Sequence, residues 1–429
     1  MEGSMARIRV GILGCGGIAA IMAETVRKTK GFTLYAAASR NLDKATGFAR
    51  RNGAKKAYGS YEELLSDPKV DLVYVATPHS EHYANAKACI EHRKPCLVEK
   101  AFTVNEAQAR ELLGFAREQN VFITEAIWTR YMPFVQMMRD KLAEGVIGTP
   151  VQISANLCYN VKGKARMVEP ELAGGSLLDL GVYPLNFAAM LFGTDLLRVE
   201  ASCTYTSKHL DEQDNITLIY RDGRMATLTA SMLGISDRRG MIVGTEGCLV
   251  VDNVNNFERM TVYNKAHQKT AVYKRPRQIT GYEYELRACR QALENGWIEC
   301  PEMPHEETLR MMQICDEIRR KMGVVYPCEQ DLQPEEIPAA GATPQRVNET
   351  GTEEMPGLEV AMKTVAEAGA VDATQPAEGV DAARAESAES AEEGSAADLR
   401  AADRSADESV TASLQNPSPE ENVLQQPEE

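Results

Sequence analysis

In the first 127 residues, segments whose apolar positions have the spacing of a β-strand alternate with segments that have the spacing of a helix. Short apolar runs rich in β-branched residues read as buried strands, and the stretches between them have helical spacing. The runs are 7–13, 33–38, 72–76, 96–99 and 121–126, and the helical stretches are 18–29, 61–65, 81–91 and 104–119. Strands that alternate with helices predict a parallel, doubly wound α/β sheet.

A second pattern begins after a predicted helix at 133–144. Asp222-Gly223 is a strong hairpin signal between two strand-like runs, and short turns rather than helices separate most of the others. These runs are 151–159, 197–205, 215–220, 225–232, 240–244 and 249–254. A mostly antiparallel sheet is therefore expected. Two helices, at 282–295 and 306–322, end this region, and we expect them to pack back on the folded body.

The last hundred residues have a third composition. Residues 331–429 are rich in Ala, Glu, Ser, Asp and Pro and carry no aromatic residue. Such a stretch buries too little apolar surface to offset its ordering entropy, so we expect a disordered acidic tail. The tail is interpreted as a solubilising appendage rather than a partner-binding segment.

The charge of the chain is concentrated in that tail. The net charge is −15, but 23 of the 62 acidic and 5 of the 47 basic residues follow residue 330, so the tail carries −18 and the body +3. A near-neutral body argues against a broad nucleic-acid surface. No apolar run reaches the length of a membrane span, and a strand begins too early for a signal peptide.

The ten cysteines are scattered, with no Cys-x-x-Cys pair and no Cys/His cluster at zinc spacing. No metal site is therefore predicted. With no export or membrane signal, a reduced, cytoplasmic setting is the expectation.

A glycine-rich motif joins the first predicted strand to the first predicted helix. Gly14 permits a tight turn, Gly16 allows the backbone to approach a pyrophosphate, and Ala19 lets the helix pack on the strand. Gly17 and Ile18 open the helix, whose N-terminus offers unpaired N–H groups to phosphates. This context predicts a Rossmann dinucleotide-binding domain.

The end of the second strand predicts which dinucleotide is bound. An NAD enzyme usually has an acidic residue here for the ribose 2′-hydroxyl, whereas this chain has Ser39-Arg40. A hydroxyl followed by a guanidinium suits a 2′-phosphate, which arginine binds through charge-assisted hydrogen bonds. We therefore predict NADP (NADPH) as the cofactor.

Three later groups of residues carry chemistry. Thr77-Pro78 is followed by His79 and His82 at the carboxyl end of one strand, and Glu99-Lys100 ends the next. Ligands of doubly wound sheets lie at this edge. The third group is Asp179-x-x-x-Tyr183, whose spacing places both side chains on one face of a helical turn.

These motifs together resemble the glucose–fructose oxidoreductase, inositol dehydrogenase and rhizopine catabolism family (Gfo/Idh/MocA) over about residues 6–328. Tyr183 in place of the family's usual histidine, the segment 125–131 and Ser39-Arg40 are similar to one branch. That branch contains glucose–fructose oxidoreductase, NADP-dependent xylose dehydrogenase and dimeric dihydrodiol dehydrogenase. The resemblance implies a Rossmann domain (5–127), a substrate and oligomerisation α+β domain with an open sheet (128–330), and then the tail (331–429).

The resemblance also implies roles for individual residues. Lys100 and Tyr183 would handle the hydroxyl proton, and Asp179 would assist or orient them. Trp128, Arg130 and Tyr183 would line the substrate pocket, and Glu99 and His82 would hold the nicotinamide end, beside Thr77 and Pro78. The family's Glu-Lys-Pro is Glu99-Lys100-Ala101 here, so the missing proline could loosen the lysine.

The sequence thus predicts an NADP-dependent oxidoreductase for a sugar or small vicinal diol, of aldose or trans-dihydrodiol type, that forms a homodimer or homotetramer. Lysine and tyrosine both have reference pKa values of about 10. Lys100 beside Tyr183 would favour the phenolate, but which of them first accepts the proton stays open. The alternatives are a relative that uses bound nicotinamide in a closed redox cycle, for glycoside cleavage or epimerisation, and a non-enzymatic NADP sensor.

Overall fold

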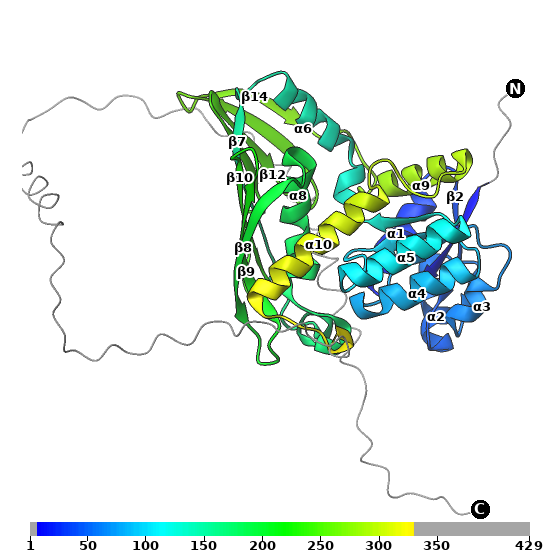
Figure 1. Ribbon diagram of the computed structural model, residues 1–429. Coiled ribbons are helices and arrows are strands. Elements are labelled where there is room, and N and C mark those ends of the chain that lie inside the picture. Colours follow the sequence, from blue (N-terminus) through cyan, green and yellow to red (C-terminus); the bar gives the residue numbers. More distant parts are fainter. Residues whose placement is uncertain (1–6, 330–429) are drawn as a thin grey trace, which may run out of the picture. The chain divides into compact units, whose positions relative to one another are not determined.

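The computed structural model describes residues 7–329 and contains two β-sheets with helices packed against them (Figure 1). The first sheet is parallel and flanked by helices, and the second is mixed. The predicted fold class is therefore confirmed. The predicted disordered tail, 331–429, lies outside the described residues.

The first sheet has six parallel strands in the order β3-β2-β1-β4-β5-β6. Its strands are β1 (Ile8–Leu13), β2 (Phe32–Ala38), β3 (Lys56–Tyr58), β4 (Leu72–Val75), β5 (Cys96–Glu99) and β6 (Ile123–Ala126). Its helices are α1 (Gly17–Lys28), α2 (Leu42–Asn52), α3 (Tyr61–Leu65), α4 (His79–Glu91) and α5 (Glu106–Gln119). The order reverses between β1 and β4, so the carboxyl ends of these strands form the crevice where such sheets bind ligands.

The second sheet has eight strands in the order β14-β13-β12-β11-β7-β10-β9-β8. Only β7 and β10 pair in parallel, as the predicted mostly antiparallel sheet requires. Its strands are β7 (Pro150–Cys158), β8 (Leu196–Tyr205), β9 (Asp211–Tyr220), β10 (Met225–Ser231), β11 (Gly240–Gly244), β12 (Gly247–Asp252), β13 (Arg259–Asn264) and β14 (Lys269–Lys274).

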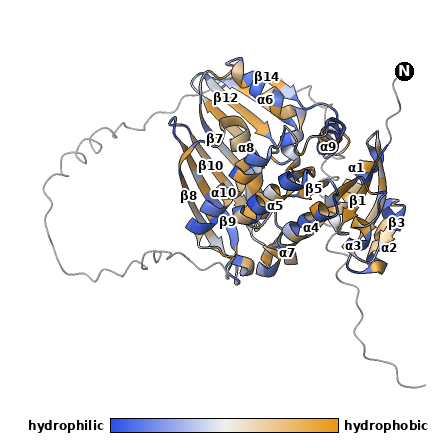
Figure 2. Cartoon of the chain, turned by 45° about the vertical axis from the view of Figure 1, so that its right-hand side comes forward, coloured by the Kyte–Doolittle hydropathy of each residue, from blue (hydrophilic) through white to orange (hydrophobic). Residues whose placement is uncertain are grey.

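Helices cover one face of the second sheet. Helix α6 (Pro133–Ala143), the π-helical turn η3 (Leu177–Gly181) and helix α8 (Val182–Phe192) lie on this face, and α10 (His305–Met322) packs on β8 (Figure 1). Hydrophobic residues concentrate in the strands of both sheets, among them β1 and β12 (Figure 2). The helical stretch Pro170–Phe192 is long and apolar enough to cross a membrane, but 94% of its apolar window is buried inside the protein. Its burial identifies it as a segment of the protein core. No apolar stretch of this length was predicted from the sequence.

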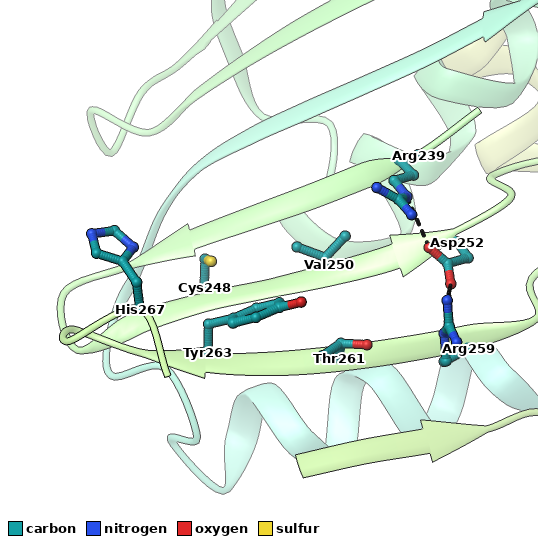
Figure 3. A pocket seen from close by; sticks show the side chains of 8 residues that line it. All are labelled: Arg239, Cys248, Val250, Asp252, Arg259, Thr261, Tyr263 and His267. Atoms are coloured by element: carbon teal, nitrogen blue, oxygen red, sulfur yellow. Dashed lines mark hydrogen bonds and ion pairs between the residues drawn. The ribbon is translucent and has the colours of Figure 1, made fainter. Parts of the chain in front are cut away.

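The opposite face of the second sheet carries no described helix. Across β11, β12 and β13 this face is hollowed to about 350 Å³ (Figure 3). Asp252 lies at one end of the hollow between Arg239 and Arg259, with the closest oxygen–nitrogen distances 3.0 and 2.5 Å. Val250, Thr261 and other uncharged side chains line most of the rest. Since the charges that are present pair with one another, this face is largely uncharged.

The last two long helices return to the first domain, as the sequence predicts. Helix α9 (Glu283–Asn295) contacts α1, and α10 packs on α5 as well as on β8. The backbone of Ile298 accepts a hydrogen bond from the N–H of Ile123 in the edge strand β6, at 3.0 Å. The C-terminal part of the described chain therefore joins the two sheets.

Three strands, β3, β13 and β14, and two long helices, α2 and α8, were not predicted from the sequence. The hairpin of β13 and β14 was missed because its exposed edge positions are polar and no glycine marks the turn. Strand β3 has only three residues. Helix α8 was missed because nearly every one of its residues is buried, which leaves no polar face to reveal a helical period. The short helix α7 (Ala165–Val168) and the 3₁₀ turns η1 (Trp128–Tyr131), η2 (Pro170–Leu172) and η4 (Pro327–Glu329) complete the described elements.

Candidate active site

The glycine-rich loop between β1 and α1 has the geometry that its sequence predicts. Gly14 has φ +96°, and a Cβ there would lie 2.5 Å from the carbonyl oxygen of Ala76. A Cβ on Gly16 would meet nothing within 4 Å, which leaves room beside the backbone. Gly16 is the N-cap residue of α1 and has no side chain that could accept a hydrogen bond from the helix. The N–H groups of Gly17 and Ile18 at the start of the helix are therefore not capped by a side chain. These residues fit the pyrophosphate of a dinucleotide.

A cationic corner follows β2. Ser39 is nearly buried and its Oγ accepts a hydrogen bond from the Asn41 N–H at 3.4 Å, while Arg40 is exposed. Lys44 lies in the first turn of α2, near Cys15. Burial raises the pKa of the Cys15 thiol to about 11, and the positive charge of Lys44 acts in the opposite direction. Sequence reasoning missed Lys44, although its place one turn after Ser39-Arg40 is a usable signal.

Lys100 and Asp179 connect the two domains at the carboxyl edge of the first sheet. The Lys100 Nζ donates to the backbone oxygen of Asp179 at 2.6 Å and to its Oδ1 at 3.0 Å. The guanidinium of Arg166 contacts the same Oδ1 at 2.6 Å, and the Nε2 of His79 is 3.9 Å away. Burial alone would raise the pKa of Asp179, but Arg166 and Lys100 hold it well below its usual value. The carboxylate therefore stays ionised and fixes the lysine.

The missing proline after Lys100 does not leave the lysine unsupported. Ala101 is buried, and its carbonyl oxygen lies 2.7 Å from the Nδ1 of His82. These contacts support the segment in place of the proline.

Glu99 lies behind Lys100 and is a titrating group near neutral pH. Its Oε1 accepts a hydrogen bond from the buried hydroxyl of Tyr74, and its Oε2 accepts the N–H of Lys100 at 3.2 Å. Burial raises the pKa of Glu99 to about 7, against the lowering effect of these donors and of the lysine charge. Glu99 is 6% exposed, so it faces the site from beneath rather than lining an open surface.

An aromatic wall stands beside Lys100. The Nε1–H of Trp128 donates to the hydroxyl oxygen of Tyr183 at 3.1 Å, and the Trp128 ring stacks on Tyr282 with centroids 4.2 Å apart. Lys100 lies over the Tyr183 ring, 5.1 Å from its centroid. The structure thus brings Lys100, Asp179, Tyr183 and Trp128 together. Tyr282 was not predicted, because it begins a helix about 150 residues away with no motif around it.

Burial reverses one electrostatic expectation about this wall. The pKa of Tyr183 lies well above 10, first because the phenol is buried and then because of the negative charge of Glu99. The cation of Lys100 lies over the ring and does not outweigh these effects. In the protein by itself Tyr183 is therefore a phenol, not the phenolate that the sequence argument favours.

Thr77, Pro78 and His82 lie at the end of β4, as predicted, but His82 is fully buried. Its Nε2 is 2.8 Å from the carbonyl oxygen of Thr77, and its Nδ1 faces the Ala101 carbonyl oxygen already described. Both ring nitrogens are thus engaged by the backbone. His82 thus connects the segments that follow β4 and β5, and its help in holding the nicotinamide end stays a prediction.

Arg130, predicted to line the substrate pocket, lies behind the aromatic wall. Its side chain is buried, with the Nε 2.5 Å from Asn186 Oδ1 and one terminal nitrogen 3.0 Å from Glu307. These partners belong to α8 and α10, so Arg130 braces the core behind Trp128 instead of lining a substrate pocket. Arg166 and His79 stand at the site in its place, through their contacts with Asp179.

The described residues hold no group of three or more His, Cys, Asp or Glu side chains placed to bind a metal ion. What the arrangement offers instead is a lysine, a phenol and a buried carboxylate at the edge of a dinucleotide-binding sheet. Such a set can hold and transfer a proton next to a hydride-transferring cofactor.

Comparison with known families agrees with this class of protein. Residues 8–126 match the model "Oxidoreductase family, NAD-binding Rossmann fold", and residues 135–250 match the "GFO/IDH/MocA C-terminal domain". The chain belongs to the Gfo/Idh/MocA family of oxidoreductases, in the branch of the dihydrodiol dehydrogenases. It is an NAD(P)-dependent dehydrogenase that acts on CH–OH groups.

Similar proteins include two vertebrate trans-1,2-dihydrobenzene-1,2-diol dehydrogenases. The one from Xenopus tropicalis is 33% identical over 300 residues, which are 68% of this chain and 91% of that protein. The one from Sus scrofa is 31% identical over 329 residues, 75% of this chain and 98% of that protein. Among solved structures, the 3-ketoreductase KijD10 from Actinomadura kijaniata, in complex with NADP and TDP-benzene, has a TM-score of 0.68 and 27% identity. That match covers 74% of this chain and 98% of KijD10.

We predict that Glu99 makes folding stability depend on pH. A carboxyl whose pKa is higher in the folded than in the unfolded state contributes stability that is full below pH 4.5 and is lost as pH rises through about 7. This loss amounts to about 3 kcal/mol. Glu99→Gln therefore flattens the stability profile between pH 5 and 8, measured by denaturant unfolding. A wild-type slope in the variant would contradict the assignment; Glu91→Gln, on an exposed position of α4, serves as the control.

Proposed function

We propose that this protein is an NADP-dependent oxidoreductase that transfers hydride between nicotinamide and a sugar or a small vicinal diol, of aldose or trans-dihydrodiol type. The observation that carries the proposal is the Lys100–Asp179 pair beside the Tyr183 phenol at the edge of the dinucleotide-binding sheet. The names of the two vertebrate relatives support the diol, and KijD10, a ketoreductase solved with NADP, supports the cofactor.

The cationic corner after β2 supports NADP over NAD. Arg40 and Lys44 are both exposed cations at the start of α2, and no carboxylate stands in the place of Ser39 to accept a ribose 2′-hydroxyl. Two positive charges near a helix N-terminus favour a doubly charged phosphate. The loop of Gly14 to Ile18 would hold the pyrophosphate, and Glu99 and Thr77 would lie near the nicotinamide end.

The proton would be handled by the chain's own residues. A bound nicotinamide supplies or accepts the hydride. Because Trp128 donates to the oxygen of Tyr183, the phenol's own proton is free to point toward a substrate oxygen. Lys100 would hydrogen-bond the same substrate oxygen while Asp179 keeps the ammonium in place. Since burial raises the pKa of Tyr183, the phenol carries its proton at neutral pH and is in the state that donates to a developing alkoxide.

Two alternatives make different predictions for the same assay. A relative that keeps its nicotinamide in a closed redox cycle would turn over substrate without net NADPH. A non-enzymatic sensor would bind NADP(H) and be indifferent to Lys100. The joined lysine, carboxylate and phenol weigh against the sensor, since a sensor needs no proton donor.

We also propose that the uncovered face of the second sheet, defined by the outward residues of β10 to β13, contacts a second copy of this chain. A two-fold interface joins the same surface of both copies, so a face whose charges are already paired suits it. Met241 and Val243 of β11 are only half-buried, as is Val250 of β12 (Figure 3), which leaves apolar area for a partner.

Lys100→Met is expected to lower turnover by about 10²–10⁴-fold, because it removes a proton-handling group and leaves Asp179 without one of its cations. The measurement is absorbance at 340 nm with NADPH or NADP⁺ and a panel of D-xylose, D-glucose, a cyclic trans-diol and its ketone. Lys87→Met, which breaks the Lys87–Glu111 pair on the surface, should leave turnover unchanged. Equal activity of Lys100→Met and wild type would exclude the proposed chemistry.

Arg40→Glu is expected to raise the KM for NADP⁺ by about 100-fold while that for NAD⁺ changes less than about threefold, since only NADP carries the 2′-phosphate. Initial rates with both cofactors test this. Arg50→Glu, at an exposed position near the end of α2, the helix that follows Arg40, is the matched control for charge reversal. A parallel loss with both cofactors would place Arg40 outside the phosphate site.

Val250→Glu is expected to convert the protein from an oligomer to a monomer, because two carboxylates would be buried opposite each other. Light scattering should give a multiple of the 47.2 kDa chain for wild type and a single chain for the variant. Leu42→Glu, an equally drastic change at a 55% exposed position of α2, should leave the mass unchanged. A monomeric wild type would refute the interface.

A further inference from the structure

A pair of buried aspartates lies behind the π-helical turn η3 that carries Asp179. Asp211 is fully buried and Asp214 is 4% exposed, and both belong to β9. Three residues apart on a regular strand, they would point to opposite faces. The register between β8 and β9 shifts between Thr204 and Tyr205, and this bulge turns both carboxyls to the inner face.

Asp211 holds the start of the turn. Its Oδ2 accepts the N–H of Leu177, the first residue of η3, at 2.6 Å. Its other oxygen, Oδ1, lies beside Gly175, where a Cβ would come within 2.4 Å of it at a φ of +118°. Two residues beyond Leu177 is Asp179, whose backbone oxygen also binds Lys100. The Asp211 carboxyl therefore fixes the start of the turn, and the three consecutive residues 177–179 connect it to the backbone oxygen that binds Lys100.

Four buried oxygen atoms in this cluster lack a hydrogen-bond partner among the described residues when both aspartates are ionised. They are Asp211 Oδ1, both carboxyl oxygens of Asp214 and the Oγ of Ser176. Asp211 and Ser176 both lie close enough to Asp214 to affect its pKa. Two carboxylates cannot bond to each other, because each only accepts. Unpaired buried carboxylates are costly, so the cluster lacks one donor.

We propose that Asp214 carries a proton that it donates to Asp211, and that this acid pair is a positioning device for the turn bearing Asp179. With that one proton, Asp214 donates to Asp211 Oδ1, and the two carboxyl groups become partners of each other. Asp211 keeps its charge, which the backbone N–H of Leu177 stabilises. The proposal rests on the proposed function, because it assigns the pair a role in holding Asp179 and Lys100.

The surroundings of the pair favour a single negative charge. Arg319 of α10 is the one cation whose charge bears on Asp211, and it already binds Glu329 and Asp316. The remaining titratable groups that face the pair are thiols and phenols of β7, β8, α10 and the segment after α10: Cys158, Cys203, Tyr205, Cys315 and Tyr326. Burial, followed by the charge of Asp211, raises the pKa of Asp214 well above its usual value.

Two substitutions at Asp214 distinguish the effect of its hydrogen-bond donor from the effect of losing all polar contacts. Asp214→Asn keeps a donor toward Asp211 and an acceptor for Ser176. Asp214→Leu keeps the volume and removes both. Glu212→Gln, on the same bulge but paired with Lys162 at 2.5 Å, is the matched control. Hydrogen exchange of peptides covering residues 174–183 reports the turn without any need for activity.

Asp214→Leu is expected to speed exchange of residues 174–183 by about tenfold and to lower kcat by about tenfold, with NADPH affinity within about twofold of wild type. Asp214→Asn and Glu212→Gln should stay within about threefold of wild type in both. The Tm of Asp214→Asn relative to that of wild type should also rise, by about 3 °C, between pH 5 and pH 9. The reason is that a protonated buried carboxyl stabilises wild type at low pH, and this stabilisation is lost as pH rises, whereas the asparagine does not titrate.

Unchanged exchange in Asp214→Leu would overturn the positioning role. If Asp214→Asn behaves like Asp214→Leu, or if its Tm advantage does not grow with pH, the shared proton is refuted. Should Asp214→Leu fail to fold, the pH profile of Asp214→Asn decides. A wild type with no turnover on any substrate would refute the proposed function, while the exchange and Tm results would still judge the pair.

Discussion

The ion pair between Lys100 and Asp179 is the contact on which the site depends. Lys100 ends a strand of the dinucleotide-binding sheet, and Asp179 sits in a π-helical turn of the other domain. Breaking a buried pair of this kind costs about 3–5 kcal/mol, because a charge is left without a partner. The pair therefore fixes the distance between the cofactor crevice and the aromatic wall. A π-helical turn is the kind of local irregularity that proteins retain where a side chain must be aimed.

Three contacts from distant parts of the chain hold the segment that leads into the turn bearing Asp179. Tyr326, near the end of the described chain, donates its hydroxyl to the Gly174 carbonyl oxygen at 2.7 Å, and His79 bonds the Ala173 carbonyl oxygen at 3.0 Å. Together with Asp211, these contacts hold the segment before η3 from three sides. A single lysine–aspartate contact is thus supported by groups from α4, β9 and the C-terminal segment, none of which is near it in sequence.

The sequence predicted what depends on local chemistry and missed what depends on distant neighbours. Gly14 is recognised from the sequence because its φ of +96° and its contact with Ala76 exclude a side chain, and Asp179 and Tyr183 lie in one short motif. Arg130 looked like a pocket residue because an arginine beside Trp128 suggests substrate binding. Its partners, Asn186 and Glu307, come from helices 55 to 180 residues later and cannot be read from its surroundings. Asp211 and Asp214 were invisible for a related reason, since a bulge in β9 decides which way they face.

The contact between Tyr326 and Gly174 has a consequence for how the protein is made. A ribosome releases the dinucleotide-binding strands first, and all six can pair before the second sheet exists. The catalytic turn, however, receives its last hydrogen bonds from residues translated about 150 positions after it. A nascent chain can therefore fold its cofactor crevice early, but the reacting groups come into register only when synthesis of the body is complete.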